Sequence, residues 1–85
     1  MSDVWPARLA PQASAALAEL DPTVQEMVRD VLDIASRSPW SWPQWDRTDP
    51  DGADVRRASI GALTVVYWVN RPLGHLRVLT IVWAG

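Results

Sequence analysis

The stretch that decides the fold runs from Val55 to Val69 and reads VRRASIGALTVVYWV. Its second half, Leu63 to Val69, is rich in β-branched and aromatic residues, which favour strands. Gly61 and Ala62 separate this half from Val55 to Ile60, and a short break with glycine is typical of a tight turn between paired strands. The stretch therefore predicts two antiparallel strands joined by a short turn.

Side chains alternate along a strand, and this sorts the two faces of the predicted hairpin. The more apolar set is expected to face the core: Leu63, Val65, Tyr67 and Val69, with Ala58 and Ile60. The opposite set is expected on an open face: Arg57, Ser59, Thr64, Val66 and Trp68. A tryptophan on an open face predicts that the surface is covered, either by a partner or second copy of the chain, or by a loop of the chain itself.

A third strand follows from His75 to Trp83, after a hairpin loop from Asn70 to Gly74. Its alternate residues are apolar on both sides, so the pattern does not assign its faces. The three strands together predict an antiparallel meander.

Upstream of the meander, two segments have the spacing of helices. The first runs from Pro11 to Leu20 and the second from Pro22 to about Ser36, with Asp21 between them as a predicted N-cap. A connection this short predicts an antiparallel helix hairpin. Before them, Val4 to Leu9 reads as a short strand, which Pro6 predicts to lie at a sheet edge or to be poorly paired at that point.

The order strand, helix, helix, strand, strand, strand is typical of an α+β fold. We expect the helix hairpin to pack on a mostly antiparallel four-stranded sheet. The 85 residues are enough for one domain, residues 1–85, and no run of 18 apolar residues predicts a membrane span. The chain has no cysteine, which excludes disulfides and thiol catalysis.

A segment with three prolines and three tryptophans, from Ser38 to Asp54, reads as irregular. Loops of that length in a small domain tend to be functional or disordered, and tryptophans argue against disorder. Trp40, Trp42 and Trp45 are interpreted first as a cap on the core, with stacking on RNA bases as the alternative. The aspartates of this segment lack the spacing of a calcium loop, so no metal site is predicted.

Charge is distributed unevenly along the chain. Residues 1–54 hold four arginines and all ten acidic residues, a net charge of −6, whereas residues 55–85 hold four arginines and no acid, a net charge of +4. Such asymmetry can mark a surface that faces an anion, although strands also use fewer acids than helices.

Four segments together resemble the RelE/ParE family of bacterial type II toxins, over nearly the whole chain. They are VWPARLAPQA at 4–13, AELDPTVQ at 18–25, the stretch 55–69 and LRVLTIV at 76–82. The resemblance implies a βααβββ toxin domain in a bacterial cytoplasm, neutralised by a cognate antitoxin protein. RelE-like members cleave mRNA on the ribosome, and ParE-like members inhibit DNA gyrase.

The resemblance also implies site residues. Arg57 matches the family's basic residue four positions before the turn glycine, whereas the arginine that follows that glycine is replaced by Thr64, and lysines are absent. Arg57 and Arg56 are the catalytic candidates. The candidate nucleic-acid or partner surface comprises Arg47, Ser59, Thr64, Val66, Trp68 and Arg77. His75, the single histidine, is interpreted as a surface or turn residue.

The function expected on these grounds is a toxin that inhibits translation, by mRNA cleavage, or replication. Arginine can stabilise charge on a phosphate but cannot act as a general base, because its pKa lies above about 12. A metal-independent nuclease would therefore have an incomplete active site. The alternative is a catalytically inactive protein-binding module on the same fold. No cofactor is expected, and a homodimer is left open.

Overall fold

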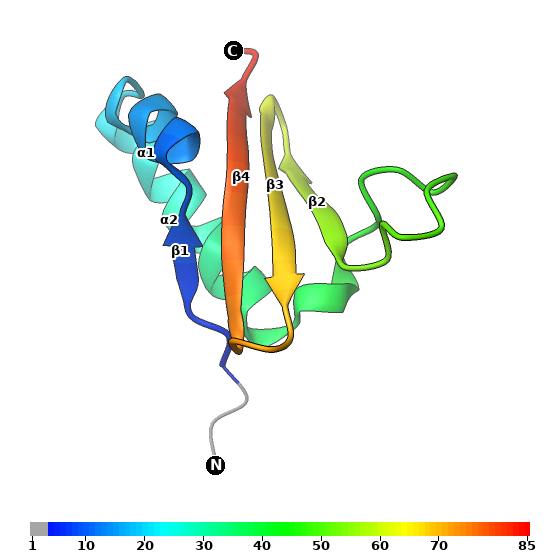
Figure 1. The fold of residues 1–85 in the computed structure, drawn as a ribbon. Coiled ribbons are helices and arrows are strands. Elements are labelled where there is room, and N and C mark those ends of the chain that lie inside the picture. The colour runs from blue at the N-terminus through cyan, green and yellow to red at the C-terminus, as the bar shows by residue number, and fades with distance from the viewer. Residues whose placement is uncertain (1–3) are drawn as a thin grey trace.

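The computed structural model describes residues 4–85, which form two helices, a short 3-10 helix and a four-stranded sheet (Figure 1). In chain order the elements are β1 (Ala7–Leu9), α1 (Pro11–Ala18), α2 (Pro22–Arg37), η1 (Pro39–Ser41), β2 (Val55–Ile60), β3 (Leu63–Asn70) and β4 (His75–Trp83). Among these residues no helix has the length and apolar character needed to cross a bilayer.

The sheet has the strand order β1-β4-β3-β2, which confirms the predicted α+β architecture. β2, β3 and β4 form the antiparallel meander, and β1 pairs in parallel with β4 at the edge. β1 is shorter than predicted, because it begins at Ala7 rather than Val4. Pro6 lacks an N–H, although its carbonyl still accepts a hydrogen bond from the Leu76 N–H at 2.9 Å.

Both helices begin at a proline, as predicted, since proline at the first helical position lacks an N–H that would be unpaired anyway. The predicted cap by Asp21 is wrong, because its side chain makes no capping hydrogen bond. α2 buries Val24, Val28, Val31 and Ala35 on one stripe, the spacing of a helix face that packs on a core.

The core lies between the helices and one face of the sheet. Leu63, Val65, Tyr67 and Val69 of β3 are fully buried there, as is Ala58 of β2. These positions confirm the predicted core face of the hairpin. Ile60 pairs with Leu63 and so belongs to the same face, but it lies at the end of β2 and is exposed.

A β-bulge explains why the faces of β4 could not be assigned from its sequence. Val66 pairs with Thr80, whereas its neighbour Tyr67 pairs with Val78, so Leu79 is the extra residue. A bulge changes the phase of alternation within one strand. Val78 and Ile81 therefore both face the core, and Arg77 and Thr80 share the opposite face.

The segment from the start of η1 to the start of β2 is fixed to the body of the protein at both ends. Near its start, the Tyr67 hydroxyl donates a 2.6 Å hydrogen bond to the carbonyl of Pro39. Near its end, Arg71 donates two 2.9 Å hydrogen bonds to the Asp54 carboxylate, and its guanidinium lies 4.7 Å from the centre of the Trp40 ring. These contacts order a stretch that has little regular secondary structure.

Candidate functional site: the open face of the sheet

The face of the sheet turned away from the core is called the open face here, and the strand register defines it. Its first row across the strands is Val55 on β2, Trp68 on β3, Arg77 on β4 and Arg8 on β1. Its second row is Arg57, Val66 and Thr80, and its third is Ser59, Thr64 and Val82. Opposed residues of neighbouring strands point to the same side, so these side chains share one surface.

This open face is basic. It carries Arg8, Arg57 and Arg77, and the four strands contain no Asp or Glu. Within residues 4–85, the ion pairs are those of Arg37 with Asp33 and of Arg71 with Asp54, so the three open-face arginines pair with no carboxylate there. Unpaired guanidinium groups are suited to bind phosphate or carboxylate groups of a ligand.

The structure brings together most of the residues that the sequence singled out for this surface. Ser59 and Thr64 lie side by side, with their hydroxyl oxygens 3.3 Å apart. Val66 also belongs to this face, but neighbouring side chains cover it and leave it 4% exposed, so it offers little surface to a partner. Trp68 is 38% exposed.

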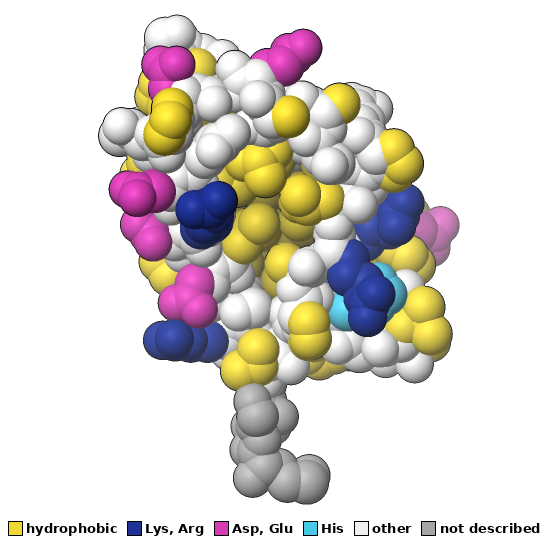
Figure 2. Space-filling model, turned by 90° about the vertical axis from the view of Figure 1, so that its left-hand side faces the viewer, with side chains coloured by type: hydrophobic (Ala, Val, Ile, Leu, Met, Phe, Trp, Pro, Cys, Tyr) yellow, Lys and Arg dark blue, Asp and Glu magenta, His cyan; other side chains and the backbone are white. Residues whose placement is uncertain are grey.

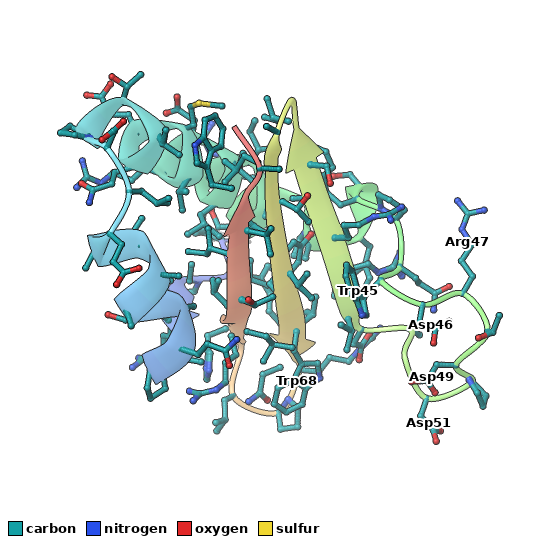
Figure 3. The ribbon with its side chains drawn as sticks, turned by 90° about the horizontal axis from the view of Figure 1, so that it is seen from above. Trp45, Asp46, Arg47, Asp49, Asp51 and Trp68 are labelled. Carbon is teal, nitrogen blue, oxygen red and sulfur yellow. The ribbon has the colours of Figure 1, made fainter. Side chains whose placement is uncertain are left out.

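Two of the predicted site residues lie elsewhere. Arg56 pairs with Tyr67 in the register and so points to the helix side, where its Nη1 donates a 3.1 Å hydrogen bond to the Trp42 carbonyl. Its alternation with Arg57 places the two guanidinium groups on opposite faces of β2. Arg47 is exposed in the protruding loop between η1 and β2 (Figure 3).

Sequence reasoning missed two residues of this surface, Arg8 and Trp45. Arg8 joins the face because β1 pairs with β4. Trp45 joins it because Gln44 forms an isolated β-bridge with Arg56, which places Trp45 opposite Val55 of the open face. The Trp45 N–H donates a 2.9 Å hydrogen bond to the Val55 carbonyl. Neither pairing has a local signal in the sequence, since each joins residues far apart in the chain.

The open face has groups suited to binding phosphate, and residues 4–85 place no evident group for proton transfer beside Arg57. The nearby hydroxyls of Ser59 and Thr64 are weak acids. Tyr67 lies on the other face, where burial raises its pKa to about 12. His75 begins β4, two positions before Arg77, at the opposite end of the sheet from Ser59 and Thr64. The arrangement can therefore bind an anion, and Arg57 can stabilise charge on it.

A second surface is apolar at its centre, unlike the basic open face. On the side of the molecule formed by α1, α2 and β1, apolar side chains gather at the centre, with acidic and basic side chains along the edge formed by α2 (Figure 2). Half-buried apolar residues of these elements, packed against the core, include Leu9, Leu17, Leu20 and Leu32. This side offers apolar contact rather than an anion site.

Comparison with known proteins finds similar solved structures but no similar sequence. No family model matches the sequence, and no curated protein matches it significantly. A chain of the RelBE2 toxin–antitoxin complex of Mycobacterium tuberculosis superposes with a TM-score of 0.79 at 18% identity, over 94% of this chain and 98% of that chain.

Two further structures extend the likeness. The isolated RelE toxin of Escherichia coli gives a TM-score of 0.80 at 19% identity, over 95% of this chain and 85% of that one. A chain of the archaeal RelE–RelB complex of Pyrococcus horikoshii gives a TM-score of 0.61 at 21% identity, over 96% of this chain and 97% of that chain. The sequence resemblance is thus confirmed at the level of architecture: this chain has the fold of the RelE toxins.

Proposed function

We propose that this protein is the toxin of a type II toxin–antitoxin system and that it inhibits translation by acting on mRNA at the ribosome. The observation that carries the proposal is the open face, with three arginines and no carboxylate on its strands, on the fold of the RelE toxins. A surface of this kind attracts a polyanion such as RNA.

In this proposal Arg57 has the central role, because it lies on the open face beside the hydroxyl pair of Ser59 and Thr64. Its planar guanidinium would hold the phosphate next to the bond that breaks and stabilise the negative charge that develops there. The proton transfers need a group outside the Arg57 neighbourhood, for which the ribosome and the RNA itself are the candidates.

A cognate antitoxin is the proposed partner. The similar RelBE and RelE–RelB structures are toxin–antitoxin complexes. The apolar side formed by α1, α2 and β1 is a suitable contact surface, because burying half-exposed leucines stabilises an interface at roughly 25 cal/mol per Å² of apolar area.

The test is expression of the protein alone and together with the product of the adjacent reading frame. The proposal expects growth arrest in the first case, relief in the second, and cleaved transcripts when 5′ ends are mapped during the arrest. Arg57→Ala should remove the arrest while the protein stays folded, and Arg29→Ala, on the outer side of α2, is the matched control. Normal growth with intact transcripts contradicts the proposal.

The second candidate is a binding module that performs no chemistry, such as a gyrase inhibitor or an inactive toxin. The lack of a proton-transfer group beside Arg57, among the residues that the structure describes, favours it. It expects arrest or partner binding without transcript cleavage. If Trp68→Ala abolishes capture of gyrase or another partner while Arg57→Ala does not, the binding module is correct and the nuclease is not.

A further inference from the structure

Two exposed tryptophans lie on the same face of the sheet, although they are far apart in the chain. Gln44 is bridged to Arg56, so Trp45 lies opposite Val55, and Val55 in turn lies opposite Trp68. Both indoles therefore belong to the first row of the open face. Trp45 is 53% exposed and Trp68 38%. Both side chains are labelled in Figure 3.

The other tryptophans of the Pro- and Trp-rich segment have structural partners. Trp40 packs edge-on against Trp5, with ring centres 5.4 Å apart, and donates from Nε1 to Asp54 at 3.3 Å. Trp42 packs against the core. Within the described part of the chain, Trp45 and Trp68 have no ring partner. Their exposure is not explained by a role in folding.

Arginines continue the same row. Arg77 lies directly beside Trp68 on β4, and Arg8 lies beside Arg77 on β1. The row thus reads Trp45, Val55, Trp68, Arg77, Arg8 across the sheet. Strands lie about 4.8 Å apart, so the backbone positions of Trp45 and Trp68 are about 10 Å apart along the row, and those of both arginines lie within about 10 Å of Trp68.

Aromatic rings next to unpaired arginines match the chemistry of a nucleic-acid strand whose bases are not paired. Every base has a flat face that can stack on an indole, and every nucleotide adds a phosphate that a guanidinium can hold. Bases inside a duplex are already stacked and offer no such face. A protein partner would also require acidic groups opposite Arg77 and Arg8, whereas RNA supplies a phosphate at each nucleotide.

We propose that Trp45 and Trp68 form a stacking platform for two unpaired bases of a single-stranded RNA, whose backbone is held by Arg77 and Arg8. The proposal rests on the proposed function, in which RNA is the substrate. It adds a binding subsite at the end of the open face remote from Ser59 and Thr64. The platform would position the strand so that its continuation passes over Arg57.

The experiment measures binding of an unstructured 12-nucleotide RNA to the purified protein, by anisotropy of a labelled strand. Trp45→Ala and Trp68→Ala should each raise the Kd by about 5- to 150-fold, the range observed when one stacking contact is removed. The matched control is Trp83→Ala. Trp83 is 37% exposed but shares the register of Leu63, so its side chain lies toward the helix side. Its removal should leave the Kd unchanged.

A second measurement does not depend on whether the variants fold. Acrylamide quenching of the intrinsic fluorescence of the unmodified protein should fall when unlabelled RNA is added, because stacked bases shield the two exposed indoles. Unchanged quenching at saturating RNA overturns the platform. So does equal affinity for the same sequence annealed into a duplex, or an unchanged Kd in both tryptophan variants.

Growth assays separate this inference from the proposed function. If Trp45→Ala and Trp68→Ala bind the RNA normally while the unmodified protein still arrests translation, the platform is wrong and the toxin proposal stands. If the RNA binds with the expected loss in both variants but expression of the protein leaves growth and transcripts unaffected, the platform stands and the toxin proposal fails.

Discussion

Tyr67 shows how one side chain can join two parts of this small domain. It is fully buried on β3, and its hydroxyl donates to the Pro39 carbonyl, which belongs to η1. Tyr67→Phe would leave that carbonyl without its buried partner. We expect a loss of about 1–3 kcal/mol in the free energy of unfolding, measured by denaturant titration.

Ser59→Ala is the control for this variant, because it also removes a hydroxyl hydrogen bond from the sheet but at an exposed position. Its effect should stay within about 0.5 kcal/mol. An equal effect of the two variants would contradict the role given to Tyr67.

Asp54 makes the stability depend on pH in the acid range. The two hydrogen bonds from Arg71 hold the pKa of Asp54 below its ordinary value of 3.8. A lowered pKa in the folded state adds stability above the unfolded value, and this stability is lost as the pH falls below about 3.8 and through the folded pKa. In Asp54→Asn, the unfolding free energy should therefore decline less steeply between pH 4 and pH 2.

Asp30→Asn, at an exposed position on α2, serves as the control for Asp54→Asn and should leave the acid decline unchanged. Parallel pH profiles for the unmodified protein and Asp54→Asn would show that the contact with Arg71 adds nothing to stability.

At the scale of elements, the local sequence was sufficient to predict a strand or helix wherever its side chains follow a single period of apolar and polar positions. The limits of β4 and the core face of β3 agree with prediction because alternation and β-branched residues are local signals. The faces of β4 required the bulge at Leu79, which depends on pairing with β3. The segment from Ser38 to Asp54 is held by Tyr67, Arg71 and Arg56, and such distant contacts have no local pattern.

β4 is the element that joins the N-terminal strand to the meander, and Leu76 tests it. Leu76 pairs with Ala7 of β1 and Val69 of β3 and is fully buried. Leu76→Ala should lower the free energy of unfolding by about 2–5 kcal/mol, because it leaves a cavity between the sheet and the helices. Thermal or denaturant unfolding measures the change.

Leu73→Ala is the matched control for Leu76→Ala. Leu73 precedes β4 by two residues, in the hairpin between β3 and β4, and is 72% exposed. The same substitution there should change stability by less than about 0.5 kcal/mol. Similar losses at the two positions would mean that burial in the core is not what Leu76 contributes.

At the scale of the whole molecule, folding turns a charge asymmetry along the chain into one between surfaces. Among residues 4–85, the acidic residues lie in the helices, the connection between them and the loop before β2, and the only acidic or basic side chains on the strands, apart from His75, are arginines. The sequence predicted the basic half and, besides Arg57, five of the open-face residues: Ser59, Thr64, Val66, Trp68 and Arg77. It could not predict that Arg8 and Trp45, from the acidic half, complete the first row, since that depends on strand pairing.

The number of arginines on the open face sets an expected salt dependence for RNA binding. Each phosphate neutralised on a single strand releases about 0.7 of a counterion, so contacts by Arg8, Arg57 and Arg77 predict a slope of about −2 for log K against log of the salt concentration. Arg77→Ala should reduce the slope by about 0.7. Arg37→Ala, whose side chain pairs with Asp33 on α2, should leave the slope unchanged. A slope near zero in the unmodified protein would show that this basic face does not bind the RNA backbone.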